Sequence, residues 1–201
     1  MQNLPRMESL EGRRLLSVVW INRGATDGFK KYYGHSANAA RALVDQAIAQ
    51  WNAADPTADR QITITAVRLE KRNPNLLGWT EGDAVTLDNN GAGHHWYFDK
   101  NVANNSDFPQ TINSTADVGN LHNKEDFYTT ILHELGHVVG FHDHDSPSHS
   151  RGAATTLAKF STSTITDDNH TSVPNDLMSA LQPVNTRRYI SAHDLLELGL
   201  S

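Results

Sequence analysis

Two histidines and a glutamate stand at a spacing that suits metal chemistry, in the run His133-Glu134-Leu135-Gly136-His137. On a helix, residues four apart lie on one face, so the two imidazoles can share one ion. Glu134 is rotated by about 100° from His133, which puts its carboxylate beside that ion. A zinc ion with three protein ligands activates a water in its fourth position, and a nearby carboxylate can accept and return the proton. The same five residues also fit an amphipathic helix with two surface histidines.

The next residues extend this pattern, because Val138-Val139-Gly140-Phe141-His142-Asp143 puts glycine at the eighth position and Asp143 at the eleventh. The run resembles the HExxHxxGxxD pattern of metzincin-clan zinc metallopeptidases, closest to bacterial matrixin-like and snapalysin-like members. The resemblance implies a sharp turn at Gly140 that brings Asp143 to the zinc as third ligand, where most members have histidine. A carboxylate oxygen is a sound zinc ligand. His142 and His144 flank Asp143, and we keep His144 as the alternative third ligand.

A second stretch supports the same resemblance. Asn175-Asp176-Leu177-Met178-Ser179 resembles the Met-turn, in which a methionine forms an apolar floor under the zinc histidines without binding the metal. Met178 is the expected floor residue, although a methionine at such a position can also be ordinary core. Some metzincins have a metal-binding tyrosine two residues later. That position is Ala180 here, so we expect no tyrosine ligand, and Tyr189 is the nearest substitute.

The resemblance implies a zinc-dependent metalloendopeptidase that hydrolyses internal peptide bonds of a protein or peptide substrate. Zinc-bound water would attack, with Glu134 as general acid and base. A matrixin-like rim at residues 84–99 would hold substrate against an exposed sheet edge. Structural calcium could bind in Asp88-Asn89-Asn90-Gly91, although a plain Asn-Gly turn explains that run as well. The alternative function is a non-catalytic, zinc-stabilised module of a bacterial surface protein, with four protein ligands closing the site.

The elements that must position these residues follow from hydrophobic periodicity and turn residues. Residues 36–54 predict a helix, and a second helix follows Asn123 as N-cap and ends at Gly140. Ser191 caps a short last helix. Strands are predicted at 15–22, 62–67, 76–79, 84–87 and 95–98, and loops at 101–123 and 145–176. The fold class is therefore α+β. The metzincin resemblance refines it to a twisted, mostly parallel sheet with an antiparallel edge strand, an active-site helix, the Met-turn and a C-terminal helix.

Composition sets the remaining limits. The 201 residues carry a net charge of −6 and no cysteine, which excludes disulfides and thiolate ligands and argues against a nucleic-acid partner. No apolar run reaches the length of a membrane span. We expect residues 1–14 to be a leader or a disordered terminus. Residues 15–201 should form one monomeric catalytic domain, split by a cleft into 15–140 and 141–201.

The N-terminal residues also bear on location and latency. Residues 7–17 resemble a leader motif of some large bacterial surface proteins, which implies export and a secreted or cell-surface location; a frayed, charged terminus fits equally. If the chain is a proenzyme, a carboxylate such as Asp27 could cover the metal.

Overall fold

The computed structural model describes residues 17–69, 75–108, 123–141, 156–159, 170, 171, 173 and 175–200. The expected leader at 1–14 lies outside these residues. Among them, none of the helices has the length and apolar character that crossing a bilayer requires. The elements, in chain order, are β1 (Val18–Trp20), α1 (Phe29–Tyr33), the 3-10 helix η1 (Gly34–Ser36), α2 (Ala37–Ala54), β2 (Arg60–Val67), β3 (Leu76–Glu81), β4 (Ala84–Asp88), β5 (Trp96–Tyr97), β6 (Glu125–Asp126), α3 (Phe127–Val139), β7 (Thr156–Lys159) and α4 (Ala192–Glu197).

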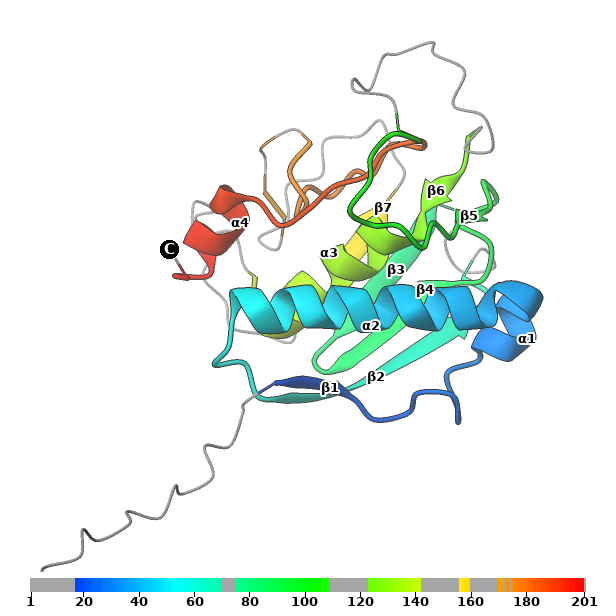
Figure 1. Cartoon of the computed structure of the whole chain (residues 1–201), viewed down its shortest axis with the longest axis horizontal. Coiled ribbons are helices and arrows are strands. Elements are labelled where there is room, and N and C mark those ends of the chain that lie inside the picture. Colours follow the sequence, from blue (N-terminus) through cyan, green and yellow to red (C-terminus); the bar gives the residue numbers. More distant parts are fainter. Residues whose placement is uncertain are drawn as a thin grey trace, which may run out of the picture.

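The larger sheet has five strands in the described part of the chain, in the order β1-β2-β4-β3-β7 (Figure 1). Neighbours β1, β2 and β4 are parallel, and β3 is antiparallel to both β4 and β7. The expected α+β class with a mostly parallel sheet is therefore confirmed. The antiparallel strand, however, is not at the edge, because β7 pairs along its outer side. The prediction of a loop at 145–176 is wrong for residues 156–159, which form β7.

The predicted substrate rim at residues 84–99 was expected to form an exposed sheet edge, and its first strand does not. Its first strand, β4, pairs with β2 on one side and with β3 on the other, so it has no open edge. Its last strand, β5, pairs with β6 in a separate two-stranded sheet. Continuous hydrophobic strands are typical of the middle of a sheet, and the sequence of β4 did not distinguish that position from an edge.

Helices α2 and α3 pack side by side on one face of the sheet and bury the core beneath them (Figure 1). In α2 the buried side chains recur at three- and four-residue spacing, as predicted, and Trp51 completes the stripe. The Trp51 indole N–H donates to the Leu132 carbonyl of α3 at 2.8 Å. This bond ties the two helices together over 81 residues of sequence separation. Among the fully buried residues of this core are Leu43, Ala47, Ile62, Ile64, Leu87, Ile131, Leu132 and Leu135.

The start of α3 differs from the prediction. Asp126, not Asn123, is the N-cap, and its carboxylate accepts from the Thr129 amide at 3.1 Å. Asn123 has a positive φ of 52° and precedes the strand residues Glu125 and Asp126. Because Asp126 pairs with Tyr97 in the small sheet, its backbone is extended, which is the conformation an N-cap residue needs. The end of α3 at Gly140 is as predicted, with φ at 105°.

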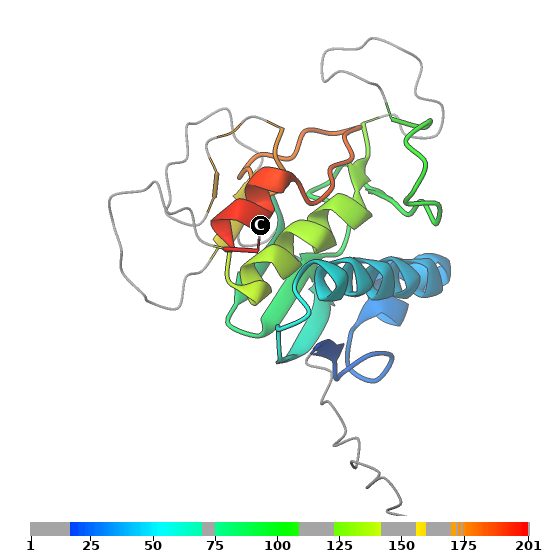
Figure 2. The same ribbon diagram turned by 60° about the vertical axis from the view of Figure 1, so that its left-hand side comes forward.

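A buried arginine anchors that first turn of α3. Arg187 binds the Asp126 carboxylate through Nε at 3.0 Å and through Nη2 at 2.8 Å. Its Nη1 reaches Asp99 at 2.9 Å. The side chains of Arg187 and Asp126 are both fully buried. The chain from residue 175 to 200 lies on the side of α3 that faces away from α2 (Figure 2).

We expect Arg187→Ala to destabilise the fold by about 3–5 kcal/mol, because it leaves the Asp126 carboxylate buried without its cation. Urea unfolding followed by circular dichroism measures this difference. The matched control is Arg23→Ala, which breaks the exposed bidentate pair with Asp45. Surface pairs of that kind contribute about 0–1 kcal/mol, so equal losses for the two variants would contradict the assigned anchor.

Candidate metal centre

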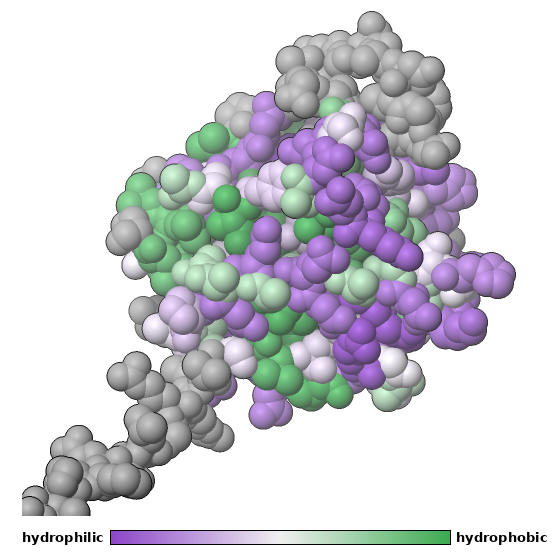
Figure 3. All heavy atoms as spheres, in the orientation of Figure 1, coloured by the Kyte–Doolittle hydropathy of each residue, from purple (hydrophilic) through white to green (hydrophobic). Residues whose placement is uncertain are grey.

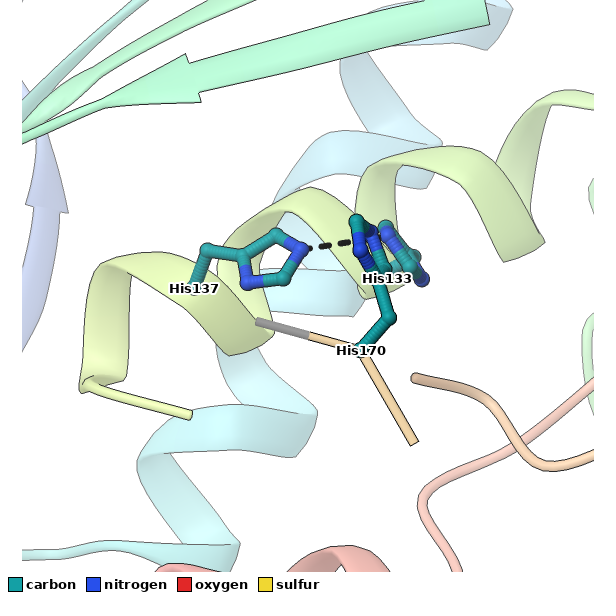
Figure 4. Close-up of side chains that lie close together, drawn as sticks. All are labelled: His133, His137 and His170. Carbon is teal, nitrogen blue, oxygen red and sulfur yellow. Dashed lines mark hydrogen bonds between the residues drawn. The ribbon is translucent and has the colours of Figure 1, made fainter. Parts of the chain in front are cut away.

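Three imidazoles come together at the middle of α3 (Figure 4). His133 and His137 extend from successive turns of the helix, and His170 approaches from the chain that precedes the 175–179 turn. Their ligand nitrogens all lie within 4.8 Å of one another. The His170 ring stacks on the His133 ring at a centroid distance of 5.2 Å and stands at 85° to the His137 ring.

The two helical histidines have the geometry of a shared ligand pair. Nδ1 of His133 lies 2.8 Å from the Leu177 carbonyl oxygen, which can only accept, so this nitrogen carries the proton. Nε2 of His133 is therefore the lone-pair nitrogen, and it lies 3.2 Å from Nε2 of His137. Two nitrogens bound at about 2.0–2.1 Å to a tetrahedral zinc would be about 3.3 Å apart. The residues present thus fit a zinc ion.

The sequence did not single out His170. It belongs to the cluster of seven histidines between His122 and His170, but no spacing rule connects it to His133. Its place depends on tertiary contacts of the next residue: the Thr171 amide donates to the Met178 carbonyl at 3.1 Å, and Thr171 forms a parallel bridge with Ser179. The high density of histidines in this part of the sequence could have pointed to His170. The pairing of Thr171 with Ser179, which positions His170, could not be predicted from local sequence.

Met178 lies directly against α3, where the sequence predicted an apolar floor. It is fully buried, and a Cβ built on Gly136 would meet its Sδ at 2.5 Å and its Cε at 2.9 Å. The 175–179 turn is held by the Asp176 carboxylate, which accepts from the Met178 amide at 3.2 Å. Gly136 therefore provides the space that lets this turn approach between the two histidines.

Glu134 turns its side chain toward the sheet. The Thr80 hydroxyl donates to its Oε2 at 2.7 Å, and a Cβ on Gly78 would lie 2.9 Å from its Oε1. Within the described residues, Oε1 has no hydrogen-bond partner although it is buried. Burial raises the pKa of the Glu134 carboxyl to about 8, and the Thr80 hydrogen bond opposes this shift. One carboxylate oxygen thus has a hydrogen-bond partner, and the other has none among the described residues.

The other predicted site residues have varied outcomes. Asp143 and its neighbours His142 and His144 lie outside the described residues, so the ligand that the resemblance implies stays a prediction. The Tyr189 hydroxyl contacts the Val102 carbonyl and the Asn105 side chain.

The two carboxylates considered for other functions are engaged by the fold. The Asp88 carboxylate accepts from the amides of Leu69, Asn90 and Ala92, as expected of a hydrogen-bonded turn, and calcium there stays a prediction. The Asp27 carboxylate binds Arg41 at 2.7 Å and accepts from the amides of Gly24 and Phe29. Asp27 therefore shapes the turn before α1 and is not available to cover a metal.

Comparison with known proteins gives no relationship on which to rely: no family model, curated protein or solved structure matches this chain.

We expect Gly136→Ala to destabilise the protein by about 1–3 kcal/mol, because the added methyl group overpacks the contact with Met178. In a Met178→Ala background the same substitution should cost less, because the contact with Met178 is gone and alanine favours a helix by about 1 kcal/mol over glycine. Trp51 Cζ2, 3.2 Å from the added Cβ, keeps part of the cost. Thermal unfolding of the four proteins gives the coupling energy. A coupling energy near zero would show that Met178 does not limit the approach to α3.

Proposed function

We propose that the chain is a zinc-dependent endopeptidase and that His133, His137 and His170 hold its ion. The observation that carries this proposal is the distance of 3.2 Å between the lone-pair nitrogen of His133 and Nε2 of His137, beside a third imidazole. Three protein ligands are the number found in catalytic zinc sites, which keep a fourth position open. When bound, zinc polarises a carbonyl group and lowers the pKa of water.

The protein's own contribution to the reaction is proton transfer and orientation. Glu134 follows His133 directly on α3, and Thr80 fixes its Oε2, so Oε1 is the atom that would take a proton from water and return it to the leaving amine. The Leu177 carbonyl holds the His133 ring in one tautomer and one orientation. Such outer contacts orient metal ligands and support their affinity for the ion.

Substitution of Glu134 by glutamine tests the reaction. The Glu134→Gln variant should keep its zinc, measured by elemental analysis, and lose at least about 100-fold in casein cleavage, because the amide cannot accept the proton. A chelator should abolish wild-type cleavage, and added zinc should restore it. The control is Glu81→Gln, an exposed residue at the end of β3, which should cleave at the wild-type rate.

Two results would overturn the endopeptidase proposal. Undiminished cleavage by Glu134→Gln would remove the residue from the chemistry. A zinc-loaded wild type that cleaves no protein or peptide, and whose ion has four protein ligands by X-ray absorption, would instead establish the non-catalytic zinc module.

The third ligand has a separate test. We expect His170→Ala to weaken zinc binding at least about 10-fold. In this proposal His170 takes the ligand position that the metzincin resemblance gives to Asp143, so Asp143→Ala should bind zinc like the wild type. Competition with a zinc-binding dye measures both affinities. The reverse result, with Asp143→Ala weakened and His170→Ala unchanged, would assign the position to the carboxylate that the metzincin resemblance implies.

A further inference from the structure

A second group of metal-binding side chains lies where the 175–179 turn meets α4. It consists of Asp176 in the turn and His193 and Asp194 in the first turn of the helix, and we call it the turn–helix cluster. Their ligand atoms all lie within 4.8 Å of one another. Asp176 is 7% and Asp194 0% exposed. None of these residues belongs to the three-histidine group.

The cluster contains buried polar atoms that the fold leaves without partners. Asp194 Oδ2 accepts from the Ser191 amide at 2.7 Å as part of a capping box. Asp194 Oδ1, in contrast, is buried and has no hydrogen bond from any described residue. The same holds for Nδ1 of His193, which lies 3.8 Å from Asp176 Oδ2. Within the described residues, this small cluster thus contains a buried carboxylate oxygen and a ring nitrogen that no donor or acceptor approaches at hydrogen-bond distance.

Helix α4 contributes a buried carboxylate to this cluster, while its C-cap Leu198 packs against the core. Of its six residues, all of them described, Asp194 is the one that is buried. Leu196 is 59% exposed, and hydrophobic side chains gather on the surface over α4 in Figure 3. A helix normally attaches through an apolar stripe. Here the buried residue is a carboxylate, and burying its charge is costly unless the charge is compensated.

The nearest permanent charge, Arg188, compensates the cluster only in part, because it attracts Asp176 and Asp194 electrostatically but its Nη1 hydrogen bond goes to the main chain. Arg188 donates through Nη1 to the Asp176 main-chain carbonyl at 2.9 Å, and its Nε has no hydrogen bond within the described chain. Asp176, His193 and Asp194 each direct a possible ligand atom into the same small space. A divalent cation could bind all three groups.

We propose that Asp176, His193 and Asp194 bind a second divalent cation of the zinc type, which joins the 175–179 turn to α4. Two carboxylates and one imidazole are zinc ligands, whereas calcium takes six to eight oxygens. The ion would hold the 175–179 turn in place. Leu177 follows the ligand Asp176 in this turn, and its carbonyl orients His133. This site stands independently of the proposed endopeptidase activity.

Zinc stoichiometry tests the second site on the full-length chain. After chelation and reloading with zinc, the wild type should retain two ions per chain by elemental analysis. His193→Ala and Asp194→Asn should each retain one, and the double variant His133→Ala/His137→Ala should also retain one. The control His35→Ala replaces an exposed histidine of η1 and should retain two.

Thermal unfolding gives a second readout that does not involve catalysis. Zinc should raise the melting temperature of His133→Ala/His137→Ala, and addition of His193→Ala to that variant should abolish the increase. His193 is 33% exposed in its side chain, so its removal should leave the fold intact even if Asp194→Asn does not fold. Equal numbers of ions in the wild type and in His193→Ala, whether one or two, would overturn the proposal. Neither result depends on whether Glu134→Gln loses protease activity.

Discussion

The hydrogen bond between His133 and the Leu177 carbonyl joins the two parts of the candidate centre. On one side of it, α3 supplies two imidazoles at fixed spacing. On the other, the 175–179 turn supplies the carbonyl and the buried Met178. The Met178 carbonyl also accepts from the amide of Thr171, the residue after His170. Because a carbonyl only accepts, this contact selects the tautomer in which Nε2 of His133 can bind a cation. Without it, the helical spacing would place the rings but would not determine which nitrogen faces the site.

That arrangement needs α3 to stay fixed relative to the chain after residue 170, and buried charges serve this purpose. Arg187 binds the N-cap carboxylate Asp126, and both side chains are buried. Nearby Glu125 is also buried, and its desolvation raises the pKa of its carboxyl to about 9. A neutral Glu125 leaves Arg187 to compensate Asp126 and Asp99. These buried ion pairs hold the first turn of α3 against the chain that carries Arg187.

The parts of this fold that sequence predicted are those with local causes. The stripe of α2, the glycine end of α3 and the Ser191 cap each depend on residues within a few positions, and all three are found in the structure. The missed features depend on distant partners. Asp126 is the N-cap because its pairing with Tyr97 keeps its backbone extended. Residues 156–159 form β7 by pairing with β3, which is distant in sequence. His170 joins the histidines through a contact of its neighbour with Met178.

The environment of the Glu134 side chain depends on strand β3 of the sheet. Its carboxylate occupies the space over Gly78, where any larger residue would collide with it, and Thr80 fixes one of its oxygens. Both partners are on β3, two residues apart, so they face the same side of the sheet. A shift of β3 by one residue would replace them with side chains of the other face. The register between β3 and β4 therefore determines the environment of Glu134 as directly as the helix that carries it.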